Sequence, residues 1–180
     1  DFNVDEKKIL ASKLDELGVD YIEGGWPGAN ATDTQFFNEK IEFKKSTFTY
    51  VRQPEMLGLG HAILTGQPLI GNEPFAVILA DDLCDCNGDQ VMLQMIKIYE
   101  KYQCSIIAIE EIPESQVNSY GVISAEQIKG YSDIYFVNDM IEKPETRHAP
   151  SNLAIIGRYI LTPDIFDILK DTKPDASGEV

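Results

Sequence analysis

The 180-residue chain carries 15 Lys and Arg residues against 30 Asp and Glu, which gives a net charge of −15. Broad binding to nucleic acids or anionic membranes relies on Lys and Arg that neutralise phosphate groups, so the charge balance argues against both. Hydrophobic residues make up 43% of the chain, enough for a globular domain with its own core.

The cysteine content and the absence of targeting signals bear on the compartment. Cys84, Cys86 and Cys104 make an odd number without the spacing of a disulfide framework, which suits a reducing environment. No apolar run reaches the length of a membrane span, and no signal peptide heads the sequence. We therefore expect a cytoplasmic protein that does not contact a membrane.

Helix and strand patterns alternate along the first third of the chain. Apolar residues recur at helical spacing within residues 5–18, which begin with acids and stop at a glycine. A short strand is expected at 19–25 and a helix at 33–43. Residues 46–53 are rich in β-branched and aromatic side chains, which predicts a strand.

The alternation continues to the end of the chain. A glycine-rich loop leads to a helix beginning near residues 58–61. The later expected elements are a strand at 75–80, a helix at 90–103, a buried strand at 104–112, a hairpin-type excursion at 122–144, and a strand and helix within 151–172. Such alternation with near-continuous apolar strands predicts an α/β fold with a Rossmann-like, mainly parallel sheet.

The apolar strand at 75–80 ends in two aspartates, Asp81 and Asp82. Strands of open α/β sheets present metal or phosphate sites at their carboxyl ends. Asp is also common as a cap at the start of a helix, so the pair has an ordinary structural explanation as well.

From about residue 48 onward the chain resembles the sugar-nucleotide pyrophosphorylases. The matching segments are VRQ…GLGHAIL, GNEPFAVILADD, SYGVI, MIEKP, APSNLAIIGRYILTPDIFDIL and TKPDASGEV. Within that family the likeness is to the UTP–glucose-1-phosphate uridylyltransferases. It implies a nucleotidyltransferase fold and the conversion of UTP and glucose 1-phosphate to UDP-glucose and pyrophosphate. It also implies Mg²⁺ as cofactor, and it leaves a homo-oligomer open.

The same resemblance assigns roles at the nucleotide end. Gln53 and the backbone of Gly58 would read the uracil base, and Asp81 would bind the metal. A Gln side chain offers one acceptor and two donors, and a glycine lets the backbone approach a flat ring closely. An ordinary strand-to-helix turn is the alternative interpretation of Gln53 and Gly58.

At the sugar end the resemblance assigns Gly121, Glu142, Lys143 and Asn152. A carboxylate such as Glu142 accepts hydrogen bonds from sugar hydroxyls, and Lys143 is a point charge for a phosphate. Asn152 would bind the sugar or order its loop. An exposed ion pair that contributes little is the alternative for Glu142 and Lys143.

The first 47 residues carry a different resemblance. EKKILASKLDELGVDYIEGGWPGANATDTQFF is similar to citramalate synthase, a relative of isopropylmalate synthase. This implies a βα fragment of TIM-barrel origin over residues 1–47, followed by the nucleotidyltransferase core over 48–180. Two other functions follow as alternatives: a citramalate-synthase-like acyltransferase fragment, and a non-catalytic binding module with a nucleotide fold.

The pyrophosphorylase pattern also includes groups that this sequence lacks. They are a Gly-x-Gly-Thr-Arg loop that cradles the triphosphate, a later Lys, and a second metal-binding Asp. We therefore expect an incomplete core that contributes no catalytic residue. Losing several such contacts exceeds the roughly 2–4 kcal/mol typical of one preorganised donor, so the expected activity is impaired.

Overall fold

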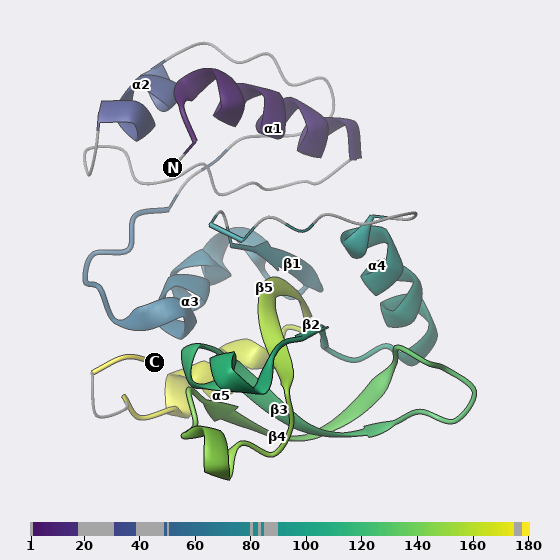
Figure 1. Ribbon diagram of the computed structural model, residues 1–180. Coiled ribbons are helices and arrows are strands. Elements are labelled where there is room, and N and C mark those ends of the chain that lie inside the picture. Colours follow the sequence, from purple (N-terminus) through teal and green to yellow (C-terminus); the bar gives the residue numbers. More distant parts are fainter. Residues whose placement is uncertain are drawn as a thin grey trace. The chain divides into compact units, whose positions relative to one another are not determined.

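The computed structural model describes residues 2–17, 31–38, 49, 51–79, 81, 82, 84, 90–174 and 178–180. Figure 1 shows the helices and strands of these segments. The chain divides into two compact units. The first unit comprises residues 1–83 and 160–180, and the second comprises residues 84–159.

Helix α1, Val4–Leu17, begins at a reciprocal cap. The Asn3 side chain accepts a hydrogen bond from the Glu6 backbone N–H at 3.0 Å, and the Glu6 carboxylate accepts one from the Asn3 N–H at 2.8 Å. The pair satisfies two backbone donors that the first turn of a helix leaves without partners. This local chemistry fixes where the helix starts.

Helix α2, Ala31–Asn38, packs against α1 in the first unit. Phe36 and Ala11 are buried. Lys7 forms an ion pair with the buried Asp33, and its ammonium lies 5.9 Å from the centre of the Phe36 ring. Burial of a carboxylate is tolerated here because an opposite charge accompanies it.

The first unit also holds helix α3, Gly58–Ile70, strand β1, Phe75–Ile78, and helix α5, Ile165–Asp171. Helices α3 and α5 lie against each other. The rings of Phe75 and Phe166 stack with centroids 5.1 Å apart and an interplanar angle of 5°. Since Phe166 is almost fully buried, this aromatic pair anchors α5 to β1.

The second unit contains one α-helix, four strands that meet in a sheet, and two short 3₁₀ helices among the described residues. They are α4 (Val91–Tyr102), β2 (Ile106–Glu111), η1 (Glu114–Ser119), β3 (Gly121–Gln127), β4 (Tyr135–Glu142), η2 (Thr146–His148) and β5 (Leu153–Leu161). The last two residues of β5 belong to the first unit.

Strand β3 lies between β4 and β5, and β2 also pairs with β5. The β3–β4 and β3–β5 pairs are both antiparallel. The prediction of a mainly parallel sheet is therefore wrong for the β3–β5 pair, whereas the antiparallel β3–β4 pair agrees with the hairpin expected at 122–144. Continuous apolar strands indicate burial on both faces but do not fix strand direction, whereas the short β3–β4 connection allows only an antiparallel pair.

The register of the β3–β4 hairpin changes once. Gly121 lies opposite Glu142, and the pairs continue regularly to Ser124 opposite Asp139. Ala125 then lies opposite Val137, so Asn138 is an extra residue that forms a β-bulge. The bulge separates the half of the hairpin that holds Glu142 from the half that leads to the loop.

The core of the second unit lies on β3 and its neighbours. Val122 and Ala154 pack with Ile112 and Val117 in one buried cluster. Ile123, on the other face of the same strand, is also fully buried. Both faces of β3 are therefore covered.

Most of the expected elements are present. The helices expected at 5–18, near 58–61 and at 90–103, the strands at 75–80 and 104–112, the hairpin, and the final strand and helix are all confirmed over their described residues. Of the strand expected at 46–53, the described residues 49 and 51–53 form no ladder, and the other residues lie outside the described ones. The strand expected at 19–25 lies outside the described residues, as does the part of the helix at 33–43 beyond residue 38.

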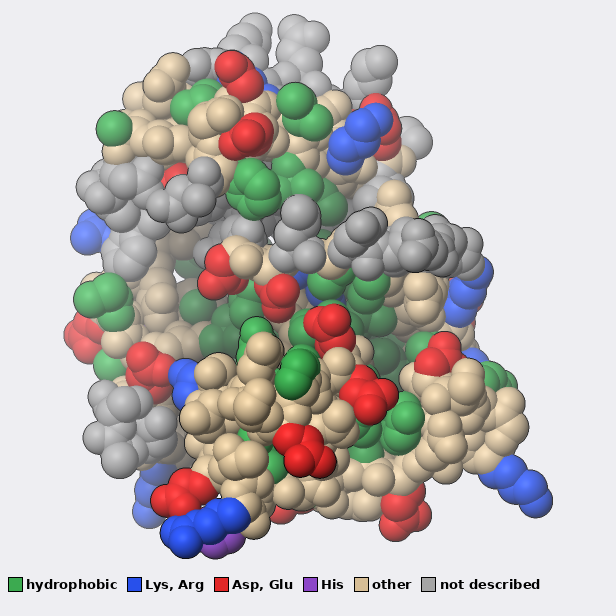
Figure 2. All heavy atoms as spheres, viewed as in Figure 1, with side chains coloured by type: hydrophobic (Ala, Val, Ile, Leu, Met, Phe, Trp, Pro, Cys, Tyr) green, Lys and Arg blue, Asp and Glu red, His purple; other side chains and the backbone are tan. Residues whose placement is uncertain are grey.

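Acidic side chains are scattered over the face in Figure 2 and are not gathered in one patch. Across the part of the chain that the structure describes, no helix has the length and apolar character needed to cross a membrane.

We expect Ile123→Ala to lower the free energy of unfolding by about 2–5 kcal/mol, since it removes a fully buried side chain from a close-packed site. Chemical denaturation followed by circular dichroism measures the change. Ile168→Ala is the matched control, because Ile168 is 56% exposed and its truncation should change stability by no more than about 0.5 kcal/mol. Equal effects of the two variants would contradict the assignment of the core to β3.

Candidate functional site

Gln53 and Gly58, predicted from the sequence to act together, are in direct contact. The Gln53 amide nitrogen Nε2 lies 3.1 Å from the Gly58 carbonyl oxygen, to which it donates. The same nitrogen lies 2.9 Å from His61 Nδ1. Gln53 precedes α3, whereas Gly58 and His61 belong to its first turn, so the side chain of Gln53 ties the incoming segment to the helix start.

Two glycines at the start of α3 leave room for residues 179 and 180, which lie against the helix. The Gly60 N–H donates to the Val180 carbonyl at 2.7 Å, and the Val180 N–H donates to the Leu57 carbonyl at 2.8 Å. A Cβ on Gly60 would lie 2.6 Å from the Val180 oxygen. Gly58 has φ +85° and would bring a Cβ to 2.8 Å from the Cβ of Glu179. Close backbone approach therefore explains both glycines.

Asp81 follows β1 and is exposed. Within the described ranges, no three His, Cys, Asp or Glu side chains lie together in a group that could hold a metal ion. Magnesium often takes only one or two protein carboxylates and completes its shell with water and phosphate oxygens. A single accessible carboxylate fits that requirement, and the metal role of Asp81 stays a prediction.

Gly121, Glu142 and Lys143 lie together at one end of the β3–β4 hairpin. Gly121 is opposite Glu142 in the ladder, and a Cβ on Gly121 would lie 2.9 Å from Glu142 Oε2. Glycine thus leaves room for the Glu142 carboxylate. The Lys143 ammonium lies 3.3 Å from Glu142 Oε1, and both side chains are exposed.

Lys143 also has a strained backbone. Its φ is +43°, in the left-handed region that residues with a Cβ adopt at a cost of about 1–2 kcal/mol. Its N–H donates to the Tyr120 carbonyl at 3.0 Å, which holds it in place beside the hairpin. Strain of this kind is concentrated at functional sites, so it supports the prediction that Lys143 has a role other than packing.

Asn152 joins the ends of β2 and β5. The side-chain Nδ2 of Asn152 donates to the Ile112 carbonyl at 3.0 Å and to a Glu111 carboxylate oxygen at 3.3 Å. The backbone carbonyl of Asn152 accepts from the Ile112 N–H at 3.0 Å. Both hydrogens of the amide are therefore committed within the protein. Of the two roles predicted for Asn152, the ordering of a loop is the one these contacts describe.

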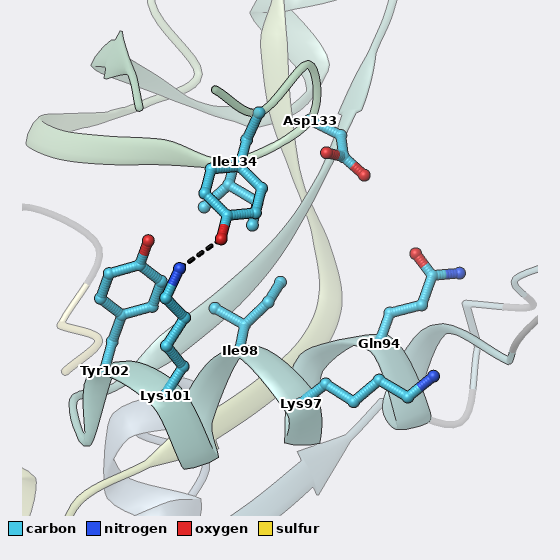
Figure 3. A pocket seen from close by; sticks show the side chains of 8 residues that line it. Gln94, Lys97, Ile98, Lys101, Tyr102, Asp133 and Ile134 are labelled. Carbon is cyan, nitrogen blue, oxygen red and sulfur yellow. Dashed lines mark hydrogen bonds between the residues drawn. The ribbon is translucent and has the colours of Figure 1, made fainter. Parts of the chain in front are cut away.

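A separate hollow of about 360 Å³ lies between α4 and the loop of the β3–β4 hairpin. Figure 3 shows side chains of α4 directed toward those of the loop. The lining combines apolar, aromatic and charged groups: Gln94, Lys97, Ile98, Lys101, Tyr102, Tyr131, Asp133 and Ile134. No sequence pattern predicted this hollow.

Lys101 lines the hollow beside Tyr102 and Tyr131. Its ammonium donates to the Tyr131 hydroxyl, and it lies 4.5 Å from the centre of the Tyr131 ring and 4.9 Å from that of Tyr102. The hydrogen bonds to Tyr131 and then Tyr102 raise the pKa of Lys101 above its usual value, because they favour the charged form. The contact joins α4 to the hairpin loop.

Two contacts at the nucleotide end were not predicted from the sequence. The first involves His61, whose Nδ1 contacts the Gln53 amide. Its position three residues after Gly58 places both on one face of α3, which is a usable signal. The second involves Val180, whose backbone bonds to Leu57 and Gly60 at the start of α3. These segments are more than a hundred residues apart, and no sequence pattern predicts their contact.

Residues 27–180 match the family model described as Nucleotidyl transferase. The chain belongs to this family of α/β proteins. Among curated relatives it is similar to a UTP--glucose-1-phosphate uridylyltransferase of Pseudomonas aeruginosa, with 62% identity over 135 residues, 74% of this chain and 48% of the relative.

Two further relatives cover almost the whole chain. A UTP--glucose-1-phosphate uridylyltransferase of Staphylococcus haemolyticus is 44% identical over 178 residues, 98% of this chain and 56% of the relative. A crystal structure of UDP-glucose pyrophosphorylase complexed with UDP-glucose has a TM-score of 0.76 and 42% identity, covering 99% of this chain and 73% of that one. The chain thus spans about half the length of the curated relatives it matches.

These relatives correct the interpretation of residues 1–47. The Staphylococcus haemolyticus relative and the solved structure extend through that segment, so the resemblance to citramalate synthase and the TIM-barrel origin are not supported. The acyltransferase and non-catalytic alternatives are likewise not favoured. The boundary between residues 47 and 48 stays a prediction.

Gly60→Ala and Gly66→Ala form a matched pair within α3. The first should lower the free energy of unfolding by about 1–3 kcal/mol, because its Cβ meets the Val180 backbone. The second should raise it by about 0.5–1 kcal/mol, because its Cβ meets only the Ile70 side chain at 3.4 Å and alanine favours a helix interior. Thermal unfolding ranks the two, and a stable Gly60→Ala variant would disprove the close approach of Val180.

Proposed function

We propose that this chain is part of a UTP–glucose-1-phosphate uridylyltransferase, which transfers the uridylyl group of UTP to glucose 1-phosphate and releases pyrophosphate. The contact of Gln53 with Gly58 carries the proposal, since it pairs the two groups expected to read the base. The names of the relatives support it, as does the solved relative complexed with UDP-glucose. The reaction would take place in the cytoplasm, and the resemblance leaves a homo-oligomeric assembly open.

At the base end, the chain supplies polar groups on a fixed turn. Gln53 offers its amide, and Gly58 offers its backbone beside it. Neither group takes part in bond making. Their contribution would be to hold the nucleotide so that the α-phosphorus faces the attacking sugar phosphate, and such positioning provides much of the rate enhancement in phosphoryl transfer.

At the sugar end, Glu142 and Lys143 offer opposite charges 3.3 Å apart. Glu142 would accept hydrogen bonds from the glucose hydroxyls, and Gly121 leaves the room that the carboxylate needs. Lys143 would attract the phosphate of glucose 1-phosphate, whose oxygen attacks the α-phosphorus in line as pyrophosphate leaves from the opposite side. Asn152 would keep the nearby strand ends in register.

Asp81 would hold magnesium together with phosphate oxygens and water. When bound, the ion would neutralise charge that builds up on the phosphate oxygens in the transition state. The exposure of Asp81 at the end of a strand supports this role, because the carboxylate is accessible to an ion that arrives with the nucleotide.

The proposed function is tested by adding UTP, glucose 1-phosphate and MgCl₂ to the protein and detecting UDP-glucose by chromatography. Titration of UTP by calorimetry with and without Mg²⁺ tests binding separately. We expect magnesium to tighten binding in the parent protein and to have less effect in Asp81→Asn, since one charged ligand is lost. Asp139→Asn is the control, because it removes the same charge from an exposed residue of β4, far from Asp81 in the sequence. Absence of both UTP binding and UDP-glucose would refute the proposal.

Lys143→Gly should separate stability from binding. Glycine adopts φ +43° without strain, so the free energy of unfolding should rise by about 1 kcal/mol. The affinity for glucose 1-phosphate should fall by about tenfold or more, since a charge-assisted contact is worth roughly 1.5–3 kcal/mol. Gln103→Gly is the control: it also replaces a residue of positive φ but should leave ligand affinity unchanged. Denaturation and calorimetry give the two readouts, and unchanged affinity in Lys143→Gly would remove Lys143 from the site.

A further inference from the structure

The contacts of Gln53 define how its amide is oriented. The Gly58 carbonyl oxygen can only accept, so the atom of Gln53 that lies 3.1 Å from it must be the amide nitrogen. The amide nitrogen can only donate, so His61 Nδ1, at 2.9 Å, must accept. This requires the ring proton of His61 to be on Nε2.

The two contacts use both hydrogens of the Gln53 amide. One is donated to Gly58 O and the other to His61 Nδ1. The group that Gln53 retains for a ligand is then Oε1, which can only accept. Beside it, the backbone N–H of Gly58 is at the first position of α3, where a helix provides no internal acceptor.

An acceptor next to a donor matches one edge of uracil. The ring N3–H of uracil is a donor, and each neighbouring carbonyl oxygen is an acceptor. We propose that His61 is a positioning residue for the base: by taking the second amide hydrogen of Gln53, it fixes Oε1 as the acceptor for uracil N3–H. The inference rests on the proposed function and adds to it the residue that, together with the Gly58 carbonyl, holds the orientation of the base-reading amide.

The side chain of Gln53 needs this second partner. The last torsion of a glutamine side chain is broad, so a single hydrogen bond to Gly58 O leaves the amide free to swing. Two acceptors on the same nitrogen hold the plane of the amide. Preorganising one polar group in this way increases affinity by lowering the ordering cost of binding.

Two variants of His61 distinguish an acceptor from a space-filling ring. His61→Phe keeps a ring but has no acceptor, whereas His61→Asn has a carbonyl oxygen that can take the place of Nδ1. UTP affinity should fall about tenfold in His61→Phe and return to within about threefold of the parent in His61→Asn. Melting temperatures are measured alongside, since a packing role would rank the variants in the reverse order.

A second ligand tests the acceptor in the parent protein itself. A UTP analogue methylated at N3 cannot donate to Gln53 Oε1, so its affinity should be at least about tenfold below that of UTP. Equal affinity for the two nucleotides would overturn the assignment. Equal loss in His61→Phe and His61→Asn would also overturn it while the proposed function stands, whereas a parent protein that does not bind UTP at all would remove the proposed function and this assignment together.

Discussion

Burial of both faces of β3 is the constraint on which the second unit depends. Val122 and Ile123 are consecutive, so they point to opposite sides of the sheet, yet neither is exposed. One side chain joins the cluster of Ile112, Val117 and Ala154, and the other is covered on the opposite face. A strand enclosed in this way cannot slip by one residue without moving each side chain to the wrong face.

That fixed register places the candidate sugar site. Because Gly121 precedes the two buried residues directly, its position opposite Glu142 is set by the core and not by the exposed end of the hairpin. Lys143 then follows Glu142 in a strained conformation that the Tyr120 carbonyl helps to hold. The functional groups are few and exposed, but the strand that carries them is rigid.

Much of this could be predicted from the sequence, and the errors have physical causes. Helical periodicity and apolar strands located most elements, because burial leaves a clear pattern in the residue types. The direction of the strands was missed, since a strand buried on both faces has the same composition in a parallel or an antiparallel pair. Of the strand expected at 46–53, the described residues 49 and 51–53 form no ladder, because β-branched and aromatic residues favour a strand only where a partner strand is available.

The candidate site was predicted in part. The resemblance to the pyrophosphorylases paired Gln53 with Gly58, and the structure brings these two residues into direct contact. The contact of Val180 with the start of α3 joins distant segments of the chain, and no local sequence pattern encodes such a contact. Comparison with relatives also replaced the separate origin assigned to residues 1–47.

The bulge at Asn138 has a consequence for how this hairpin can tolerate changes in length. The residues between Asn138 and Glu142 keep a regular ladder with β3, whereas those beyond the bulge lead to an exposed loop. An insertion in the loop would alter only the far half, because the irregular position absorbs the change in pairing. A deletion between Asn138 and Glu142 would instead turn the carboxylate to the other face of the sheet. The loop half of the hairpin can therefore vary in length, whereas the half between Asn138 and Glu142 must keep its number of residues so that the Glu142 carboxylate stays on its face of the sheet.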